Sequence, residues 1–323
     1  MCYGYDGHGA LDEAAERSGM DRRRLLRVFA GTAAAGALAL GVPGTAAAAG
    51  QAGPDHATGR PGAGRRRLNP NAISIQLYTL RSDLAKDYDG TLRYVAKTGY
   101  RKVEQAGYYG RTAGELRRFH DRLGIRTSSS HDGLSSTRTA LYEKLDNANT
   151  LGQHSLVVPY LASTDPEQWK RWAYQINSEA AAASREGLRY GYHNHAHEFL
   201  PLTNGQRPWD IFCAELDPHL VHFEVDLYWI ATGAIQSGDG ADDVEGYIAE
   251  HIDAAPLKVR QYHVKDRNPE TGIMCDLGTG HLDFPRIFAH HQVEEYIVEN
   301  DQPDVTPRQT AEVGYAYLRN LRF

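Results

Sequence analysis

The stretch "EGLRYGYHNH", Glu186 to His195, carries the signal that decides the fold. A glycine interrupts a helical pattern, a hydrophobic and a basic residue follow, and an aromatic run then ends in polar side chains. Glycine is the usual residue just after a helix because it adopts the left-handed backbone conformation without steric cost. The same order recurs in "TGYRKVE" (98–104) and "LGIRTSS" (123–129). The chain therefore predicts a repeated passage from helix to strand.

Eight segments are rich in β-branched and aromatic residues and are predicted to be strands. They are 73–79, 102–107, 126–131, 155–160, 189–195, 221–229, 261–266 and 295–300. Helical patterns separate them, among them 90–99, 113–124, 137–152 and 165–187. Eight strands that alternate with helices over about 250 residues predict an α/β fold of the (β/α)8 TIM barrel type. The alternative, a doubly wound open sheet, usually has a glycine-rich phosphate turn after its first strand, and "ISIQLYTLRSDL" (73–84) has none.

Residues 1–49 have the pattern of an export signal rather than of a folded domain. Arg22 and Arg23 open a basic segment, a short run rich in Ala and Gly follows at 28–42, and small residues then offer cleavage sites. The paired arginines predict the twin-arginine type and hence a secreted protein. The apolar run is shorter than the ~20 residues that span a bilayer, so we expect no membrane span after cleavage. Translation could start at Met1 or at Met20.

The composition that follows the leader excludes several classes of partner. Residues 50–71 are rich in Gly, Pro and polar residues and are predicted to be a flexible linker, which leaves 72–323 as the barrel. The formal net charge is -6 and the one basic cluster near the barrel, 64–68, lies in this linker, so we expect neither a nucleic-acid nor an anionic-membrane surface. Cys213 and Cys275 match no metal motif and could form a disulfide or stay reduced. A monomer and a homo-oligomer are both compatible with this composition.

Four consecutive predicted strands end in residues that bind metals in other proteins. The residues are His193, Asp226, His263 and Glu299, separated by 33, 37 and 36 positions. Each interval is one strand–helix unit, so the side chains are expected at equivalent levels on neighbouring strands, at the end of the barrel where active sites lie. Any one of them could instead be a hydrogen-bonded structural residue. Together, two imidazoles and two carboxylates predict a site for one divalent metal ion, such as Mn, Zn, Co or Mg.

A second group of polar residues is expected around the same site. Side chains two positions apart in a strand share a face, so His195, Glu224 and Lys265 should point the same way as the first set. Glu104 and His131 should face them across the barrel. Candidates for proton transfer are His195, Lys265 and Glu299, and candidates for substrate binding are Glu104, His131, Glu224, Trp229 and Tyr78. For Glu104 and Glu224, a salt bridge in the barrel wall is an equal alternative.

Several strings make the mature domain similar to a known family. The specific ones are "YHNH" (192–195), "DLYW" (226–229) and "HVKD" (263–266), with support from "ISIQLYT", "VEQAGYYG", "SSSHDGL" and "VENDQP". Over about residues 72–323 the chain resembles the sugar phosphate isomerase/epimerase family of xylose isomerase-like TIM barrels. The resemblance implies one divalent ion at the ends of the fifth to eighth strands. Asp226, His263 and Glu299 match the family's ligands, whereas His193 stands where the epimerases usually have Glu.

The resemblance also implies a reaction, in which a proton alpha to a carbonyl is removed and an enediolate forms. In the epimerases, two metal-bound glutamates act on opposite faces of the substrate. His193 in place of one of them argues against that symmetric mechanism and leaves His195 as the base. The expected function is a metal-dependent carbohydrate isomerase or epimerase that acts on a small-molecule sugar or glycoside. A secreted 3-keto-glycoside lyase or hydrolase and a sugar-binding barrel without turnover are the alternatives, and abasic-site nuclease action lacks the basic groove it would need.

Overall fold

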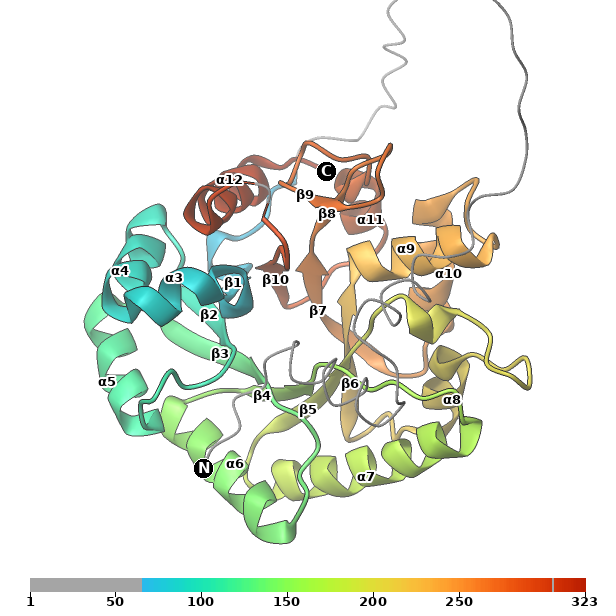
Figure 1. Ribbon diagram of the computed structural model, residues 1–323, viewed down its shortest axis with the longest axis horizontal. Coiled ribbons are helices and arrows are strands. Elements are labelled where there is room, and N and C mark those ends of the chain that lie inside the picture. Colours follow the sequence, from blue (N-terminus) through green and yellow to red (C-terminus); the bar gives the residue numbers. More distant parts are fainter. Residues whose placement is uncertain (1–65, 304) are drawn as a thin grey trace, which may run out of the picture. The chain divides into compact units, whose positions relative to one another are not determined.

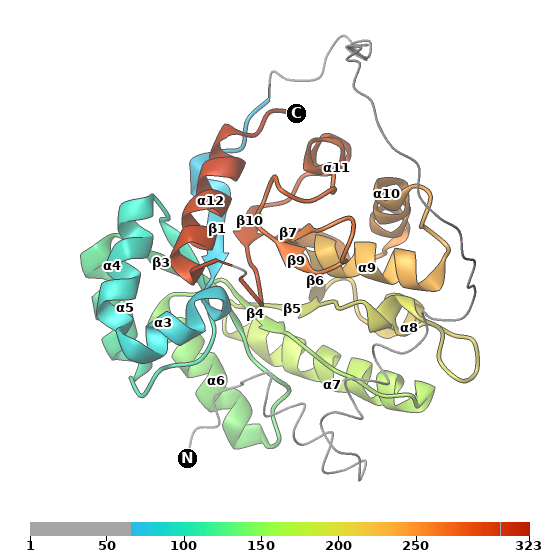
Figure 2. The same ribbon diagram turned by 45° about the horizontal axis from the view of Figure 1, so that its top comes forward.

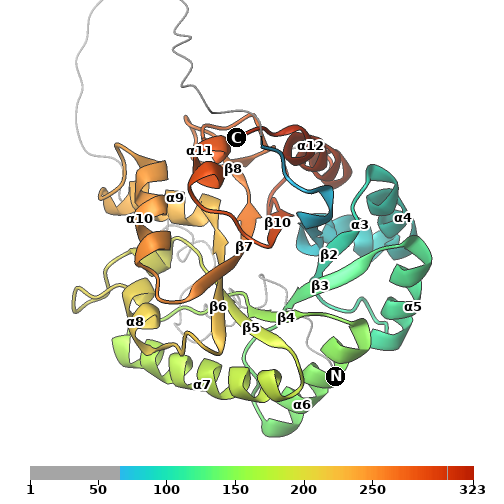
Figure 3. The same ribbon diagram turned by 180° about the vertical axis from the view of Figure 1, so that it is seen from behind.

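The computed structural model describes residues 66–303 and 305–323, so the predicted leader and residues 50–65 of the predicted linker lie outside the described residues. Within the described part, eight parallel strands close into a barrel in the order β1-β10-β7-β6-β5-β4-β3-β2. The strands lie at the centre with helices in a ring around them, as Figure 1 and the opposite view in Figure 3 show. The prediction of an α/β TIM barrel is confirmed.

Most barrel strands end earlier than the sequence predicts, and β7 also begins earlier. The strands are β1 (Ile73–Gln76), β2 (Lys102–Gln105), β3 (Arg126–His131), β4 (Ser155–Val158), β5 (Arg189–His193), β6 (Val221–Asp226), β7 (Lys258–Val264) and β10 (Glu295–Val298). Except at β3, each predicted segment runs two or three residues past the observed end. The chain leaves the sheet there because it turns at once into a loop or helix. Tyr78 and Trp229 are consequently not strand residues: they lie in η2 (Leu77–Leu80) and α9 (Leu227–Ser237).

The surrounding helices follow their predicted positions, and glycine ends two of the predicted repeats. The elements are η1 (Pro70–Ala72), α3 (Arg81–Lys86), α4 (Tyr88–Thr98), α5 (Ala113–Leu123), α6 (Arg138–Leu151), α7 (Pro166–Arg185), η3 (His197–Phe199), α8 (Pro208–Glu215), α10 (Val244–Ala254), α11 (Phe284–His290) and α12 (Pro307–Asn320). Gly124 and Gly187 follow α5 and α7 with φ of 66° and 76°. Only glycine adopts this region without strain, which explains the sequence pattern that precedes β3 and β5.

One excursion leaves the barrel after β7. Its strands β8 (Asp266–Arg267) and β9 (Met274–Cys275) form a two-stranded antiparallel sheet, which lies beside β7 and β10 in the tilted view (Figure 2). The Asp266 carboxylate accepts hydrogen bonds from the backbone N–H groups of Gly278 (2.9 Å) and Gly280 (3.0 Å), and so holds the excursion in place. The sequence analysis does not predict this element. Cys213 and Cys275 form no disulfide with each other.

The described domain begins before residue 72. Arg66 and Phe323 exchange two backbone hydrogen bonds of 3.1 Å, and Leu68 is buried in the core. Residues 66–71 of the predicted linker are therefore part of the folded unit, because they pair with the C-terminal segment and contribute an apolar side chain. In the described residues no helix is both long and apolar enough to cross a bilayer.

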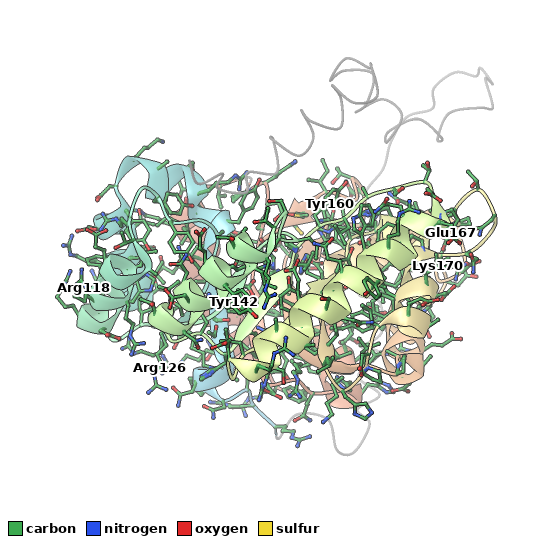
Figure 4. All side chains as sticks on the ribbon, turned by 90° about the horizontal axis from the view of Figure 1, so that it is seen from below. Arg118, Arg126, Tyr142, Tyr160, Glu167 and Lys170 are labelled. Carbon is green, nitrogen blue, oxygen red and sulfur yellow. The ribbon has the colours of Figure 1, made fainter. Side chains whose placement is uncertain are left out.

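The interior of the barrel contrasts with its surroundings. Between the strands and the helices the core is apolar, with Trp169 and Phe212 fully buried. On the outer face, Figure 4 shows Glu167 and Lys170 on α7, where they form an exposed ion pair of 2.8 Å. Inside the barrel, by contrast, the buried side chains include Gln76, Glu104, Ser129, Glu224, Gln261 and His263. Burying a polar group costs free energy unless it is hydrogen-bonded or paired with an opposite charge, so these side chains need partners inside the barrel.

Candidate metal centre

The four predicted metal ligands meet at the carboxyl ends of neighbouring strands. His193 is the last residue of β5, Asp226 is the last of β6, His263 lies in β7, and Glu299 follows β10 directly. One ligand atom from each lies within 4.8 Å of the corresponding atoms of the other three, and all four residues are buried. Sequence spacing thus located four residues that the fold does bring together.

Strand register explains why unequal neighbours converge. His193 is paired in the sheet with Glu224, Asp226 with His263, and His263 with Ile297. Passing from β5 to β10, the four residues are therefore displaced by two, zero and two positions from direct pairing. Closing a sheet into a barrel tilts the strands and staggers their register, on average by one residue per strand in a TIM barrel. The displacement compensates for this stagger, so the side chains reach the same level.

The distances within this set fit a bound divalent ion. His263 Nδ1 lies 2.7 Å from Glu299 Oε2, and His193 Nε2 lies 3.7 Å from Asp226 Oδ2. Ligand atoms about 2.0–2.2 Å from an ion are separated from one another by roughly 3–4.4 Å, so only small movements are needed. Asp226 Oδ1 accepts the backbone N–H of Trp229 at 2.8 Å and caps α9, whereas the buried Oδ2 accepts no well-directed hydrogen bond. A buried carboxylate oxygen in that condition suits a cation, and in this structure it faces the Lys265 ammonium at 2.9 Å.

Lys265 supplies the positive charge that the ligand set faces. Its buried Nζ lies 2.9 Å from Asp226 Oδ2, 2.7 Å from Glu299 Oε2 and 3.0 Å from Asp301 Oδ2. Burial would lower the pKa of Lys265, but these carboxylates outweigh it and hold the pKa well above its usual value. For Asp226, burial is the larger effect and raises the pKa of the carboxyl group. For Glu299 the opposite outcome holds, because the charges of Lys265 and His263 outweigh burial and keep its pKa well below the usual range.

Three residues predicted to bind substrate lie beneath the ligand set. Glu104 and Glu224 are completely buried, and His131 is nearly so. His131 Nε2 lies 2.8 Å from Glu224 Oε1 and 3.2 Å from Glu104 Oε1. Burial disfavours a charged His131, but the two carboxylates outweigh it and raise its pKa. The contacts of the Glu104 carboxylate and of Glu224 Oε1 with protein side chains are those that the barrel-wall alternative expects, and substrate binding by these two residues stays a prediction.

Glu104 is held by residues from three further positions on the barrel. It accepts hydrogen bonds from Gln76 Nε2 at 2.7 Å and Ser129 Oγ at 2.6 Å, and His263 Nε2 lies 2.8 Å away. Burial and the neighbouring Glu224 carboxylate raise the pKa of Glu104. Sequence parity places Glu104 on the inner face of β2, but it cannot show that its partner is 159 residues away.

His195 lies next to the ligand set without belonging to it. Its ring centroid is 5.1 Å from that of His193, 5.0 Å from Tyr160 and 5.2 Å from Trp229. Burial, with the adjacent His193, lowers the pKa of His195 well below its usual value, so its imidazole is neutral. His195 Nδ1 and Trp229 Nε1 are buried and have no hydrogen-bond partner among the described residues. These two nitrogens are therefore available to a bound substrate: the Trp229 N–H can donate to a substrate oxygen, and an imidazole nitrogen can accept a proton.

Residues that follow the strand ends hold His195 and the neighbouring backbone in place. Glu198 is buried and accepts hydrogen bonds from Tyr192 Oη at 2.6 Å and from the backbone N–H of His195 at 2.9 Å. Asn194 accepts the backbone N–H of Asp226 at 3.0 Å and thereby joins β5 to β6. Tyr78 lies at the end of β1, where the Arg81 guanidinium stacks on its ring at 4.1 Å. Asn194, Glu198 and Asp301 were not among the predicted site residues.

The comparisons with known proteins agree with this geometry. The sequence pattern of one family, described as xylose isomerase-like TIM barrel, matches residues 92–319. The chain belongs to this family. No curated protein sequence matches the chain.

Solved structures of other xylose isomerase-like proteins share the fold. A sugar phosphate isomerase/epimerase from Parabacteroides distasonis is 24% identical, with a TM-score of 0.64 over 78% of this chain and 95% of that one. A D-tagatose 3-epimerase-like protein is 13% identical, with a TM-score of 0.52 over 75% and 94%. An IOLI protein with a bound zinc atom is 12% identical, with a TM-score of 0.57 over 76% and 95%. At these identities the similarity establishes the barrel, and the chemistry rests on this chain's own residues.

Proposed function

We propose that this protein is a divalent-metal-dependent carbohydrate isomerase or epimerase that removes a proton alpha to a carbonyl. The observation that carries the proposal is the convergence of His193, Asp226, His263 and Glu299 within 4.8 Å, with the His195 ring centroid 5.1 Å from that of His193. Membership of the xylose isomerase-like family supports it. So do the names of the structural relatives, which include a sugar phosphate isomerase/epimerase and a zinc-bound protein.

The four converging residues would hold the ion. A divalent ion bound there supplies Lewis-acid stabilisation of the negative charge that develops on the substrate oxygens, worth several kcal/mol. The chain's own contribution is to place two carboxylates and two imidazoles in a dry site, where electrostatic interactions are stronger than in water. Export by the twin-arginine route and action outside the cytoplasm on a small sugar or glycoside complete the proposal.

Two groups of different chemistry would move the proton. His195 is neutral and has an unoccupied Nδ1, so it can accept the proton alpha to the carbonyl. The Lys265 ammonium, within 3 Å of Asp226 and Glu299, can return a proton from Nζ. The enediolate formed between these steps becomes an isomer when the neighbouring carbon is protonated, and an epimer when the same carbon is protonated on its other face.

The difference between these two groups also favours a second candidate, a 3-keto-glycoside lyase. A symmetric epimerase uses equivalent groups on the two faces, whereas here the two candidate groups differ: one is the His195 imidazole and the other is the Lys265 ammonium paired with Glu299. In the lyase reaction His195 takes the proton from C2, the C1–O bond breaks, a C1–C2 double bond forms, and Lys265 protonates the departing alcohol. Atoms and charges balance without an oxidant.

Incubation in deuterated water distinguishes these functions. The purified, Mn²⁺-supplemented protein is mixed with a panel of ketoses and, separately, with 3-keto-glycosides, and the products are followed by NMR and mass spectrometry. Deuterium in an isomeric or epimeric sugar supports the first function, and release of an alcohol supports the second. Asp226→Asn should lose both metal and activity, whereas His195→Asn should lose activity and retain metal. Neither exchange nor alcohol release from any substrate would leave a sugar-binding barrel as the better description.

A further inference from the structure

The two histidines of the candidate metal centre each have their ring nitrogens in different surroundings. His263 Nδ1 lies beside Glu299 Oε2 at 2.7 Å, and its Nε2 faces Glu104 Oε1 at 2.8 Å and Glu224 Oε1 at 3.0 Å. His193 Nε2 faces Asp226 Oδ2 at 3.7 Å, and its Nδ1 lies 3.2 Å from Glu224 Oε1. One nitrogen of each ring thus faces the predicted ligands, and the other faces a buried glutamate.

Glu104 and Glu224 are held in place by neighbouring side chains in the barrel interior. Gln76 Nε2 and Ser129 Oγ donate to Glu104 at 2.7 and 2.6 Å. His131 Nε2 lies within 3.2 Å of both glutamates and separates two carboxylates that would otherwise repel each other. Glu104 and Glu224 are buried and His131 is nearly so, so solvent cannot freely rearrange these three side chains.

A competing arrangement would put the ion in the lower layer instead. His131, His193, Glu224 and His263 also lie within 4.8 Å of one another. In that set, however, Glu224 Oε1 already lies within 3.2 Å of three imidazole nitrogens. Each set contains a buried carboxylate oxygen without a well-directed hydrogen bond, Asp226 Oδ2 in the upper set and Glu224 Oε2 in the lower one. The upper set, however, offers two carboxylates to a divalent cation and the lower set only one, so the upper set is the better cation site.

We infer that Glu224 and Glu104, held apart by His131, are positioning residues that select which nitrogen of each histidine binds the ion. His263 binds through Nδ1 and keeps a proton on Nε2, and His193 binds through Nε2 and keeps a proton on Nδ1. A carboxylate that holds the second N–H of a metal-bound histidine fixes the tautomer and raises the basicity of the ligand. The inference rests on the metal site of the proposed function and not on the identity of the sugar.

Nuclear magnetic resonance of the zinc-loaded protein tests the assignment. Long-range ¹H–¹⁵N spectra of protein labelled at histidine distinguish a metal-bound Nδ1 from a metal-bound Nε2. His193→Gln, His263→Gln and His131→Gln identify the signals. The expected result is one histidine bound through Nδ1, which disappears in His263→Gln, one bound through Nε2, which disappears in His193→Gln, and no zinc on His131.

Zinc affinity, measured by competition with a chelating dye, gives a second readout. Glu224→Gln keeps the shape but removes the charge that holds both imidazoles, and should weaken zinc binding about 10–100-fold, the usual range for such partners. Glu295→Gln is the matched control, because Glu295 is also buried on the barrel and is bound by Ser128 Oγ at 2.6 Å, yet lies at the opposite end of its strand. It should change the affinity less than twofold.

The outcomes separate this inference from the proposed function. Zinc bound to His263 through Nε2, zinc on His131, or equal affinities for Glu224→Gln and the wild type would overturn the inference while the metal-dependent function stands. Absence of zinc binding by the wild type would overturn both. If Glu224→Gln does not fold, the wild-type spectra alone decide the tautomers.

Discussion

Replacing Lys265 with methionine should destabilise the metal-free protein strongly. Lys265 is fully buried and lies within 3.0 Å of Asp226, Glu299 and Asp301. Methionine keeps most of the volume but leaves three carboxylates without the ammonium that lies between them. Removing one partner from a buried ion pair costs about 3–5 kcal/mol. With about 2–4 °C per kcal/mol for a domain of this size, the melting temperature should fall by roughly 6–20 °C.

A divalent ion should reverse much of this loss. The ion would replace the missing positive charge between Asp226 and Glu299, and it would no longer compete with the ammonium for their oxygens. An ion that binds only the folded state stabilises it by about 2.7 kcal/mol at 100 times its dissociation constant. Saturating Mn²⁺ should therefore raise the melting temperature of Lys265→Met by more than that of the wild type.

Lys144→Met is the matched control. Lys144 Nζ forms an ion pair with Glu179 at 2.8 Å and donates to the Gly133 carbonyl at 3.0 Å, on the outer side of the barrel wall between α6 and α7. This variant should also lose stability, but Mn²⁺ should add no more than it adds to the wild type. The assay is urea and thermal unfolding in EDTA and in Mn²⁺. A loss below about 1 kcal/mol for Lys265→Met in EDTA, or equal rescue of both variants, would refute the reasoning, since a broken buried pair costs more than this.

Three further outcomes are expected. Burial lowers the pKa of His120 and of His222 to about 4, below the unfolded value near 6.5. Between these two pH values the unfolded chain therefore binds more protons than the folded one, so the free energy of unfolding falls as the pH drops from 6.5 to 4. His120→Asn should remove up to about 3 kcal/mol of this pH dependence, measured as the urea midpoint against pH. Gly191→Ala would place a Cβ 2.7 Å from His222 Nε2 inside the barrel and should cost about 1–3 kcal/mol in urea unfolding, whereas Gly133→Ala meets open space and should be neutral. His195→Asn should lower kcat about 10²–10⁴-fold while its metal content, measured by elemental analysis, stays at the wild-type level.

Local signals in the sequence were sufficient to predict the architecture, although not every strand boundary or the contacts of every polar residue. Gly124 and Gly187 end helices with positive φ, and the strands that follow them start where predicted. Strand ends were predicted two or three residues too late because aromatic and polar residues continue past the point where the backbone turns. This error placed Tyr78 and Trp229 in strands, whereas they lie in η2 and α9. It did not displace the ligand set, because the strand–helix interval repeats whatever the position of each strand end.

By itself, the sequence determined the barrel and the four residues that converge at its mouth, because both follow from periodic local patterns and from the spacing of one strand–helix unit. Only the tertiary structure revealed which side chains Glu104, Glu224 and Lys265 contact. The reason is that contacts across a closed barrel join residues far apart in the chain, as Glu104 and His263 are joined over 159 positions. They depend on strand tilt and stagger, which no local pattern encodes. The same contacts carry the inference about which nitrogen of His193 and of His263 would bind a metal ion.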